Sequence, residues 1–208
     1  MKGTYPLKYM TLIAAMKESD TSLLIAADSA VRETPGNIPL TAIQKLRKHQ
    51  SAPLAWGCSG DTEVGDRFDA WMGTIPWPPT DWQQFSDRCA DTLAELNGQV
   101  RKRATLAGGD PYRIAGTDLL VVAWFDEPQI LEVDSWGKVA QYGSNAFHAI
   151  GSGKQIAYIA FATVKVFGGV TPLDKFRHLS GIATRTANDC DFPVHIWRVT
   201  PSGVTVTP

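Results

Sequence analysis

Cysteine is scarce in this 208-residue sequence and follows no recognised pattern. The three cysteines, Cys58, Cys89 and Cys190, are odd in number and lack the spacing of metal ligands. A disulfide framework and a zinc site are therefore both disfavoured. Because free cysteines suit a reducing cytoplasm, we expect a cytoplasmic protein that needs no metal and no cofactor.

Long apolar runs are also missing. None approaches the ~18 residues that a membrane-spanning helix needs, so no membrane role is predicted. Positive charge is not in excess, since 20 Lys and Arg residues stand against 21 Asp and Glu residues. This balance disfavours nucleic acid as a partner, because nucleic acid attracts clustered basic surfaces. No stretch rich in Ser, Gly or Pro is long enough to be a linker, so we expect one domain.

The sequence does contain the material of a globular core, with 44% hydrophobic and 20% charged residues. If two antiparallel sheets lay between pairs of helices, every apolar face would be buried. We therefore predict an α+β fold, a four-layer αββα sandwich. In chain order the patterns predict strands at 11–15, 23–27, 44–48 and 52–56, helices at 61–72 and 80–106, strands at 119–125, 130–133 and 138–142, helices at 154–167 and 171–186, and strands at 194–199 and 204–206.

Three segments allow more detailed predictions. The spacing of Val64, Phe68 and Trp71 predicts the buried face of the first helix. The segment 154–167 is apolar on nearly every side, which predicts a helix buried between other layers. The aromatic and proline-rich stretch 71–82 predicts an exposed aromatic surface that other subunits cover.

A threonine begins the first predicted strand, directly after Met10. Threonine is a weak nucleophile unless a base lies beside it, and a threonine that is the first residue has its own α-amine as that base. The preceding segment, 1–10, has no helix cap, no periodicity and no secretory apolar region. We therefore interpret 1–10 as a leader or upstream extension and 11–208 as the domain, with Thr11 as the candidate nucleophile.

Four further segments recur in a known family when they follow such a threonine in this order and at these separations. Together they resemble the proteasome β-subunit family of N-terminal nucleophile hydrolases, including the bacterial proteasome-like (HslV-like) peptidases. The resemblance covers nearly all of 11–208. The segments are Ala26-Ala27-Asp28, Ile43-Gln44-Lys45-Leu46, Ala55-Trp56-Gly57-Cys58-Ser59-Gly60-Asp61 and Ile150-Gly151-Ser152-Gly153.

The resemblance implies a mechanism for peptide hydrolysis. The Oγ of Thr11 would attack the peptide carbonyl while the amine of Thr11 takes its proton. Lys45 would favour the neutral amine by lowering its pKa, and would stabilise the threonine alkoxide. Asp28, at the end of the second strand, would be the partner that keeps Lys45 charged.

The glycine-rich segment would contact the substrate in the same way. The resemblance implies that the N–H of Gly57 binds the oxyanion and that a side chain there would obstruct the substrate strand. It also implies that Ala55 and Ser59 line the pocket for the residue before the cut. Because both residues are small, we expect a roomy pocket. Strand alternation predicts that Cys58 points away from this side.

Two more residues would orient the nucleophile. The resemblance implies that Ser152 bonds to the Thr11 amine, although a serine before a helix is equally typical of a cap. A late carboxylate is also implied, and Asp189 fits that role, because a carboxylate can accept from both the amine and Ser152. Depending on one gap, Thr186 takes its place. Self-processing relatives usually carry glycine where this sequence has Met10.

These observations favour a cytoplasmic threonine peptidase that forms a homo-oligomeric ring or double ring and cuts peptides or unfolded proteins. Two other functions stay open: a catalytically silent ring subunit that retains 1–10, and a small-molecule amidase on the same fold. The histidines lie outside any nucleophile-elbow sequence, so no Ser-His-Asp triad is predicted. Ring size, cleavage preference and the participation of an unfolding ATPase are not determined by the sequence.

Overall fold

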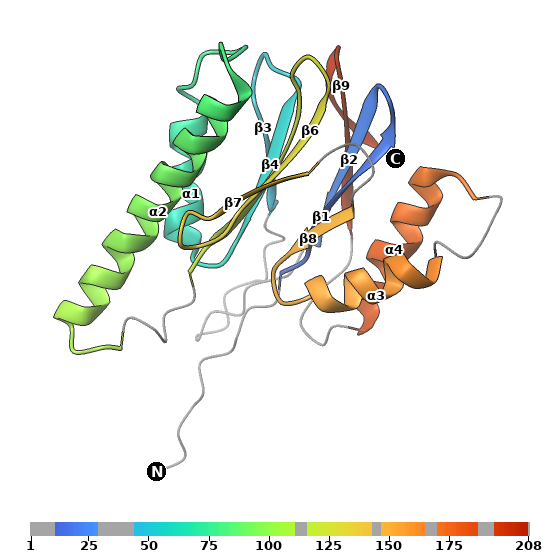
Figure 1. The fold of residues 1–208 in the computed structure, drawn as a ribbon. Helices are drawn as coiled ribbons and strands as arrows, with labels where there is room; N and C mark the ends of the chain where they lie inside the picture. Colours follow the sequence, from blue (N-terminus) through green and yellow to red (C-terminus); the bar gives the residue numbers. More distant parts are fainter. Residues whose placement is uncertain are drawn as a thin grey trace.

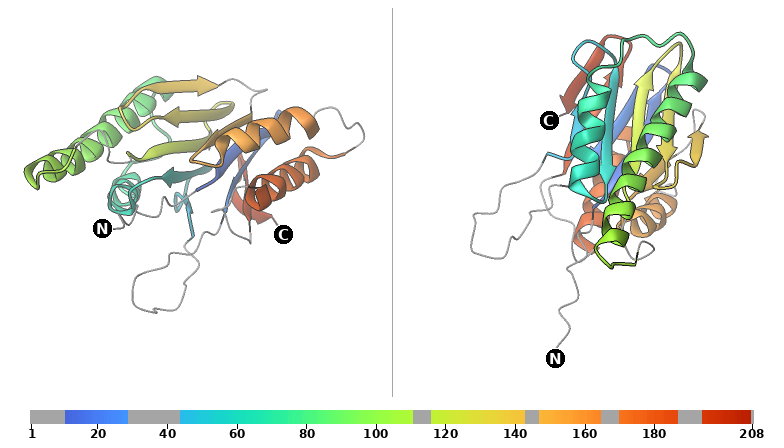
Figure 2. Two further views of the ribbon diagram at one scale, coloured as in Figure 1. Left: turned by 90° about the horizontal axis from the view of Figure 1, so that it is seen from below. Right: turned by 90° about the vertical axis from the view of Figure 1, so that its left-hand side faces the viewer.

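The computed structural model describes residues 11–28, 44–110, 116–142, 147–164, 170–186 and 194–207. Within them the chain forms two five-stranded sheets, and the hydrogen-bonded order of the strands is β10-β9-β2-β1-β8 in the first and β3-β4-β5-β6-β7 in the second. Every neighbouring pair is antiparallel. Helices flank the two sheets on their outer sides (Figures 1 and 2). The predicted four-layer αββα sandwich is therefore confirmed.

The strands follow the predicted apolar segments with one addition. The first sheet contains β1 (Ile13–Ser19), β2 (Ser22–Ala27), β8 (Phe147–Ile150), β9 (His195–Thr200) and β10 (Gly203–Thr207). The second contains β3 (Leu46–Lys48), β4 (Leu54–Ser59), β5 (Asp118–Trp124), β6 (Pro128–Val133) and β7 (Val139–Tyr142). Strand β8 was not among the predicted elements, because four residues before a glycine turn show too little alternation to be recognised.

The helices form two pairs. Helices α1 (Thr62–Met72) and α2 (Trp82–Leu106) cover the second sheet, whereas α3 (Lys154–Val164) and α4 (Pro172–Thr186) cover the first (Figure 2). The carboxylates of Asp61 and Asp81 accept backbone N–H groups of the first turns of α1 and α2. These caps satisfy donors that the helix itself leaves unpaired.

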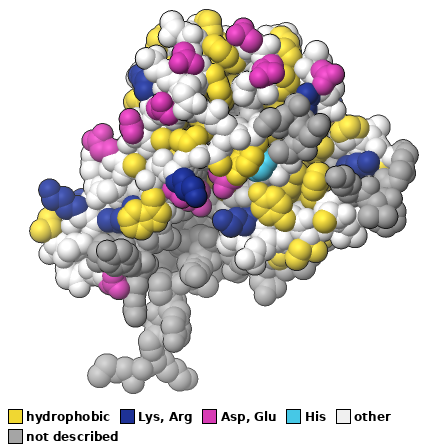
Figure 3. Space-filling model, in the orientation of Figure 1, with side chains coloured by type: hydrophobic (Ala, Val, Ile, Leu, Met, Phe, Trp, Pro, Cys, Tyr) yellow, Lys and Arg dark blue, Asp and Glu magenta, His cyan; other side chains and the backbone are white. Residues whose placement is uncertain are grey.

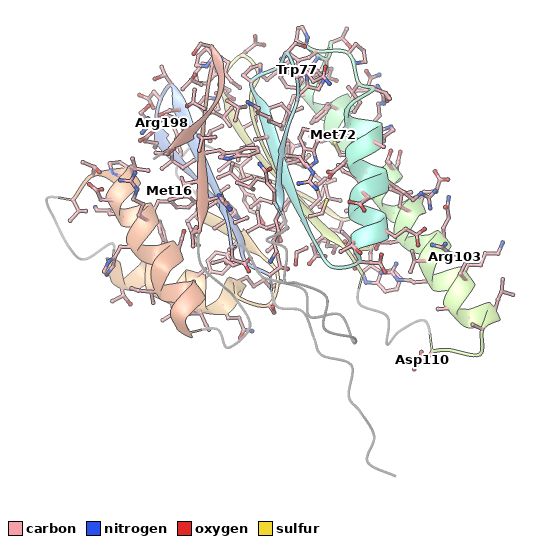
Figure 4. All side chains as sticks on the ribbon, turned by 180° about the vertical axis from the view of Figure 1, so that it is seen from behind. Met16, Met72, Trp77, Arg103, Asp110 and Arg198 are labelled. Atoms are coloured by element: carbon pink, nitrogen blue, oxygen red, sulfur yellow. The ribbon has the colours of Figure 1, made fainter. Side chains whose placement is uncertain are left out.

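Apolar side chains fill all three spaces between the layers. Ile13, Ile25, Leu120 and Val122 belong to the core between the two sheets, where each is fully buried. Burying a side chain of this size contributes about 1.5–3 kcal/mol. The outer cores form between the second sheet and α1–α2, where Met72 lies (Figure 4), and between the first sheet and α3–α4.

The buried face of α1 differs from the prediction by one residue. Val64 and Phe68 are buried as predicted, but the third member is Met72, while Trp71 is only partly buried at the margin of the core. A helix turns by 100° per residue, so positions i+7 and i+8 flank the same line, and the local packing decides between them.

The prediction of a fully buried third helix is wrong. Ala157 and Ala160 of α3 are buried against the first sheet, but Ile159 is 68% exposed and Tyr158 40% exposed. Only one side of α3 faces the sheet. The apolar residues on the other side of α3 are therefore exposed to solvent in this chain. The hydropathy of the helix alone does not show which side is exposed.

The prediction of an exposed aromatic surface at 71–82 is also wrong. Trp82 is buried, and the ring of Trp77 packs edge-on against Phe85 and Phe125. These aromatic rings join α2 to the second sheet, and edge-to-face pairs of this kind are favourable. The stretch therefore belongs to the outer core, and it no longer argues for assembly.

Candidate functional site

Thr11 lies two residues before Ile13, where β1 begins, and β1 pairs with β2 on one side and β8 on the other. Ile13 is opposite Ala27 in β2 and opposite Ile150 in β8. The residues that follow these two partners along the chain are therefore brought toward Thr11, which is itself 9% exposed. This register explains how Asp28, 16 residues from Leu12, and Ser152, 141 residues from Thr11, can contact the main chain before β1.

Asp28 is fixed by main-chain contacts at the end of β2. Its N–H donates to the carbonyl of Leu12 over 3.1 Å, and its Oδ1 accepts the N–H of Leu12 over 2.8 Å. The residue has no exposed surface. A carboxylate buried this completely needs charged and hydrogen-bonding partners to remain ionised.

Lys45 supplies the opposite charge and also reaches the threonine. Its Nζ donates to Oδ1 and Oδ2 of Asp28 over 2.8 and 2.9 Å, and to Oγ1 of Thr11 over 3.2 Å. The lysine side chain is 12% exposed. An ammonium group at this place would stabilise negative charge that develops on the threonine oxygen, because water screens it weakly.

The turn between β8 and α3 holds the main chain of Thr11. The backbone N–H of Thr11 donates to Oγ of Ser152 over 3.2 Å. The N–H of Gly153 donates to the carbonyl oxygen of Thr11 over 3.4 Å. Gly151 has a φ of 88°, and a Cβ at this position would overlap the carbonyl oxygen of Thr11. Gly151 is therefore a site residue that the sequence reasoning missed, although its motif was recognised.

Gly57 lies in β4, where it pairs with Leu46 and Leu120. A Cβ on Gly57 would lie 2.8 Å from Cδ1 of Ile13 and 3.2 Å from the carbonyl oxygen of Lys45. The glycine thus allows β4 to approach β1 closely. Close packing alone therefore requires a glycine at position 57, without any substrate. The oxyanion role of the Gly57 N–H stays a prediction.

The two residues assigned to a substrate pocket differ in position. Ala55 has no exposed surface and belongs to the core between the sheets. Ser59 lies near the site, because its Oγ is 2.9 Å from the point that a Cβ on Gly151 would occupy. Their assignment to substrate binding stays a prediction. Of the late residues, Asp189 and the side chain of Thr186 lie outside the described part of the chain.

Cys58 points to the opposite side of β4, as predicted. It packs against the core beneath α1 and α2, where Cys89 is also buried. Burial raises the pKa of both thiols well above the ordinary value, and the nearby carboxylate of Asp69 raises that of Cys58 further. A thiol that stays protonated is a poor nucleophile.

Two features are absent from the described residues. These residues contain no group of three or more His, Cys, Asp or Glu side chains that could hold a metal ion. The helices resolved there are all too short or too polar to cross a membrane.

The arrangement of two antiparallel sheets between helix pairs is the fold that this chain shares with proteasome-like proteins of known structure. Among solved structures, the chain is similar to eukaryotic HslV from Trypanosoma brucei, with 18% identity and a TM-score of 0.60 over 91% of this chain and 99% of that one. It is also similar to Anbu (ancestral beta-subunit) from Yersinia bercovieri, with 15% identity and a TM-score of 0.68 over 94% of this chain and 86% of that one. Neither a scan of protein-family models nor a sequence search of curated proteins found a match.

Proposed function

We propose that this protein is a threonine peptidase of the proteasome-like type, with Thr11 as its nucleophile. The observation that carries the proposal is the position of Lys45, whose Nζ bonds to Oγ1 of Thr11 and to both oxygens of Asp28. An ordinary ion pair between strands has no need to include a threonine hydroxyl. We further propose that the enzyme works in the cytoplasm within a homo-oligomeric ring or double ring, on peptides or unfolded proteins, with or without an unfolding ATPase.

The chemistry uses groups that meet at the start of β1. With a free amine, Thr11 carries both nucleophile and base, so the amine takes the hydroxyl proton as Oγ1 attacks the peptide carbonyl. Lys45 stabilises the charge on Oγ1, and Ser152 holds the amine in place from 3.2 Å. The N–H of Gly57 is the proposed donor to the oxyanion, and Asp189 is the proposed late orienting residue.

This mechanism requires that residues 1–10 be removed or never made. A peptide bond from Met10 turns the nitrogen of Thr11 into an amide, which cannot act as a base. The N–H of such an amide also bonds well to Ser152, so the same geometry suits a silent ring subunit that retains its leader. The presence of Met10 at the position where self-processing relatives carry glycine favours this second candidate.

Comparing two forms of the chain tests the proposal. The form that begins at Thr11 should hydrolyse fluorogenic peptides and be blocked by electrophiles that bridge a threonine hydroxyl and amine. The form that begins at Met1 should be inert. Thr11→Ser in the short form should retain partial activity, because serine supplies both groups without the methyl that fixes the rotamer, whereas Thr11→Ala should have none.

The silent-subunit function predicts a different outcome. The short form would assemble into rings, cleave no acidic, aromatic, basic or aliphatic probe, and leave Thr11 unmodified by the electrophile. The silent-subunit function would then replace the peptidase. The intact mass of the protein from its native host would show which form exists there.

A further inference from the structure

The two sheets have four edge strands in the described part of the chain: β3, β7, β8 and β10. An edge strand presents unpaired backbone N–H and C=O groups, which can pair with a strand of another chain. Proteins prevent this with charged side chains, proline, bulges or a covering element. The four edges of this chain differ in which of these devices they carry.

Strand β3 is protected by charge, since two of its three residues are Arg47 and Lys48. Strands β7 and β8 protect each other, because they lie on the same side of the sandwich and the ring of Tyr142 stacks on that of His148 with centroids 3.2 Å apart. All four residues of β8 are buried. On β7, Gln141 bonds to Gln83 of α2. Figure 3 shows this face, where charged side chains of both signs surround hydrophobic ones.

Within the described residues, strand β10 has none of these devices. Gly203–Thr207 contains no charged residue and no proline, and it pairs with β9 at five successive positions without a bulge. Thr205 is exposed, and Val206 is 67% exposed although it is a β-branched apolar residue. In the right-hand view of Figure 2 the β9–β10 hairpin, in red, forms the outer border of the molecule.

We infer that β10 is an interface with a second copy of this chain, in which the two β10 strands pair antiparallel across a two-fold axis. Such an axis at Thr205 places Thr205 opposite Thr205 of the second copy and Val204 opposite its Val206. No like charges then face each other, which is the condition that a self-pairing strand must meet. The two first sheets become one continuous sheet.

The valines give the pairing a reason beyond the backbone. Val204 is half-buried against the core between the two sheets. Val206 is two residues further along, so it lies on the same face of the strand. In the single chain this face ends at the sheet edge. In the pair, each Val206 covers Val204 of the other copy, which removes apolar surface from water. An unrelated extended peptide could pair with the backbone of β10, but it would not in general place a valine opposite Val204 and Val206.

Cross-linking tests this arrangement directly. Residues opposite each other across an antiparallel pair have Cβ atoms about 4.5–5.5 Å apart, close to disulfide geometry. Under mild oxidation, Thr205→Cys should therefore form a disulfide-linked dimer. Ser202→Cys, in the turn before β10, is the matched control, because its two copies would be about 20 Å apart at ~3.4 Å per residue. Both variants also carry Cys190→Ser.

We expect at least a tenfold faster dimerisation for Thr205→Cys than for Ser202→Cys. A second pair of variants measures assembly without cysteine. Thr205→Lys puts two ammonium groups opposite each other and should halve the sedimenting mass, whereas Ser202→Lys should not. Equal cross-linking rates, or an unchanged mass for Thr205→Lys, would overturn the inference. If the lost mass proves to be a different polypeptide, the inference is also wrong. The outcome does not depend on peptidase activity.

Discussion

Lys45 connects stability and proposed chemistry through one ammonium group, which bonds to a fully buried carboxylate and to the hydroxyl of Thr11. Removing either charge of a buried pair leaves the other uncompensated, which costs far more than the pair itself contributes. The effects of Lys45 and Asp28 substitutions should therefore differ in kind from those of surface residues.

We predict different results for two variants of the form that begins at Thr11. Lys45→Ala should abolish hydrolysis. Asp28→Ala should lower the free energy of unfolding by about 3–5 kcal/mol, because it removes the partner of a buried cation. Asp20→Ala, in the β1–β2 turn, is the control: its carboxylate is 97% exposed, so water screens its ion pair with Lys17 and the substitution should change the stability little.

Peptide assays and urea unfolding measure these effects. Activity of Lys45→Ala equal to that of the parent would remove the lysine from the mechanism. Asp28 and Asp20 variants with equal stability would show that the buried pair does not stabilise the fold.

Among the elements, β8 and the turn that follows it contribute most to the site. The strand places Ile150 opposite Ile13, and the next three residues contact the main chain of Thr11. A short strand with its glycine turn therefore determines where the proposed nucleophile lies.

Gly151 provides the test for this element. Gly151→Ala places a Cβ against the Thr11 carbonyl at a φ of 88°. The backbone strain alone costs on the order of 1–3 kcal/mol. If the turn moves by about 1 Å to relieve the overlap, activity should fall on the order of 100-fold.

Gly98→Ala in α2 is the matched control, since a Cβ there meets nothing within 4 Å. Alanine in a helix interior should stabilise the protein by about 0.5–1 kcal/mol. The Tm should thus fall for Gly151→Ala and rise for Gly98→Ala, whereas peptide hydrolysis should fall only for Gly151→Ala. A Gly151→Ala variant as stable and active as the parent would show that the turn does not position Thr11.

The pH dependence of unfolding is a property of the whole molecule, and the partly buried carboxyl group of Asp118 contributes to it. Burial raises the pKa of Asp118, although its Oδ1 accepts the N–H of Ser135 over 3.0 Å. The folded state therefore binds this proton more tightly than the unfolded state does. The resulting stabilisation is complete below the unfolded pKa of about 3.9 and is lost as the pH rises through the folded value.

Asp118→Asn should consequently raise the Tm at pH 7, where the parent has a poorly solvated charge. The amide oxygen can still accept from Ser135, so the hydrogen bond is retained. We expect a small increase, because the carboxyl group of Asp118 is only partly buried. The increase should disappear near pH 3. Asp126→Asn, in the exposed β5–β6 turn, should change the Tm little at either pH, and an equal response of the two variants would contradict the assignment.

Local patterns in the sequence predict the layers of the fold and much of the candidate site. Apolar and alternating segments predicted nine of the ten strands that the structure describes, and helical spacing predicted its four helices. Each pattern records which side of an element is buried. Thr11, Asp28, Lys45 and Ser152 were predicted to meet, and the structure brings all four together. Their chemical roles stay predictions.

The elements that cover each buried face could be identified only from the three-dimensional packing. It showed that the tryptophans of 71–82 complete an outer core, that Ala55 is enclosed between the sheets, and that one face of α3 is left open. It also revealed β8, whose pairing with β1 joins positions far apart in the chain. Periodicity is a local property of the chain, whereas the partner that buries a face or completes a strand lies elsewhere in the sequence, and its identity depends on the packing of the whole fold.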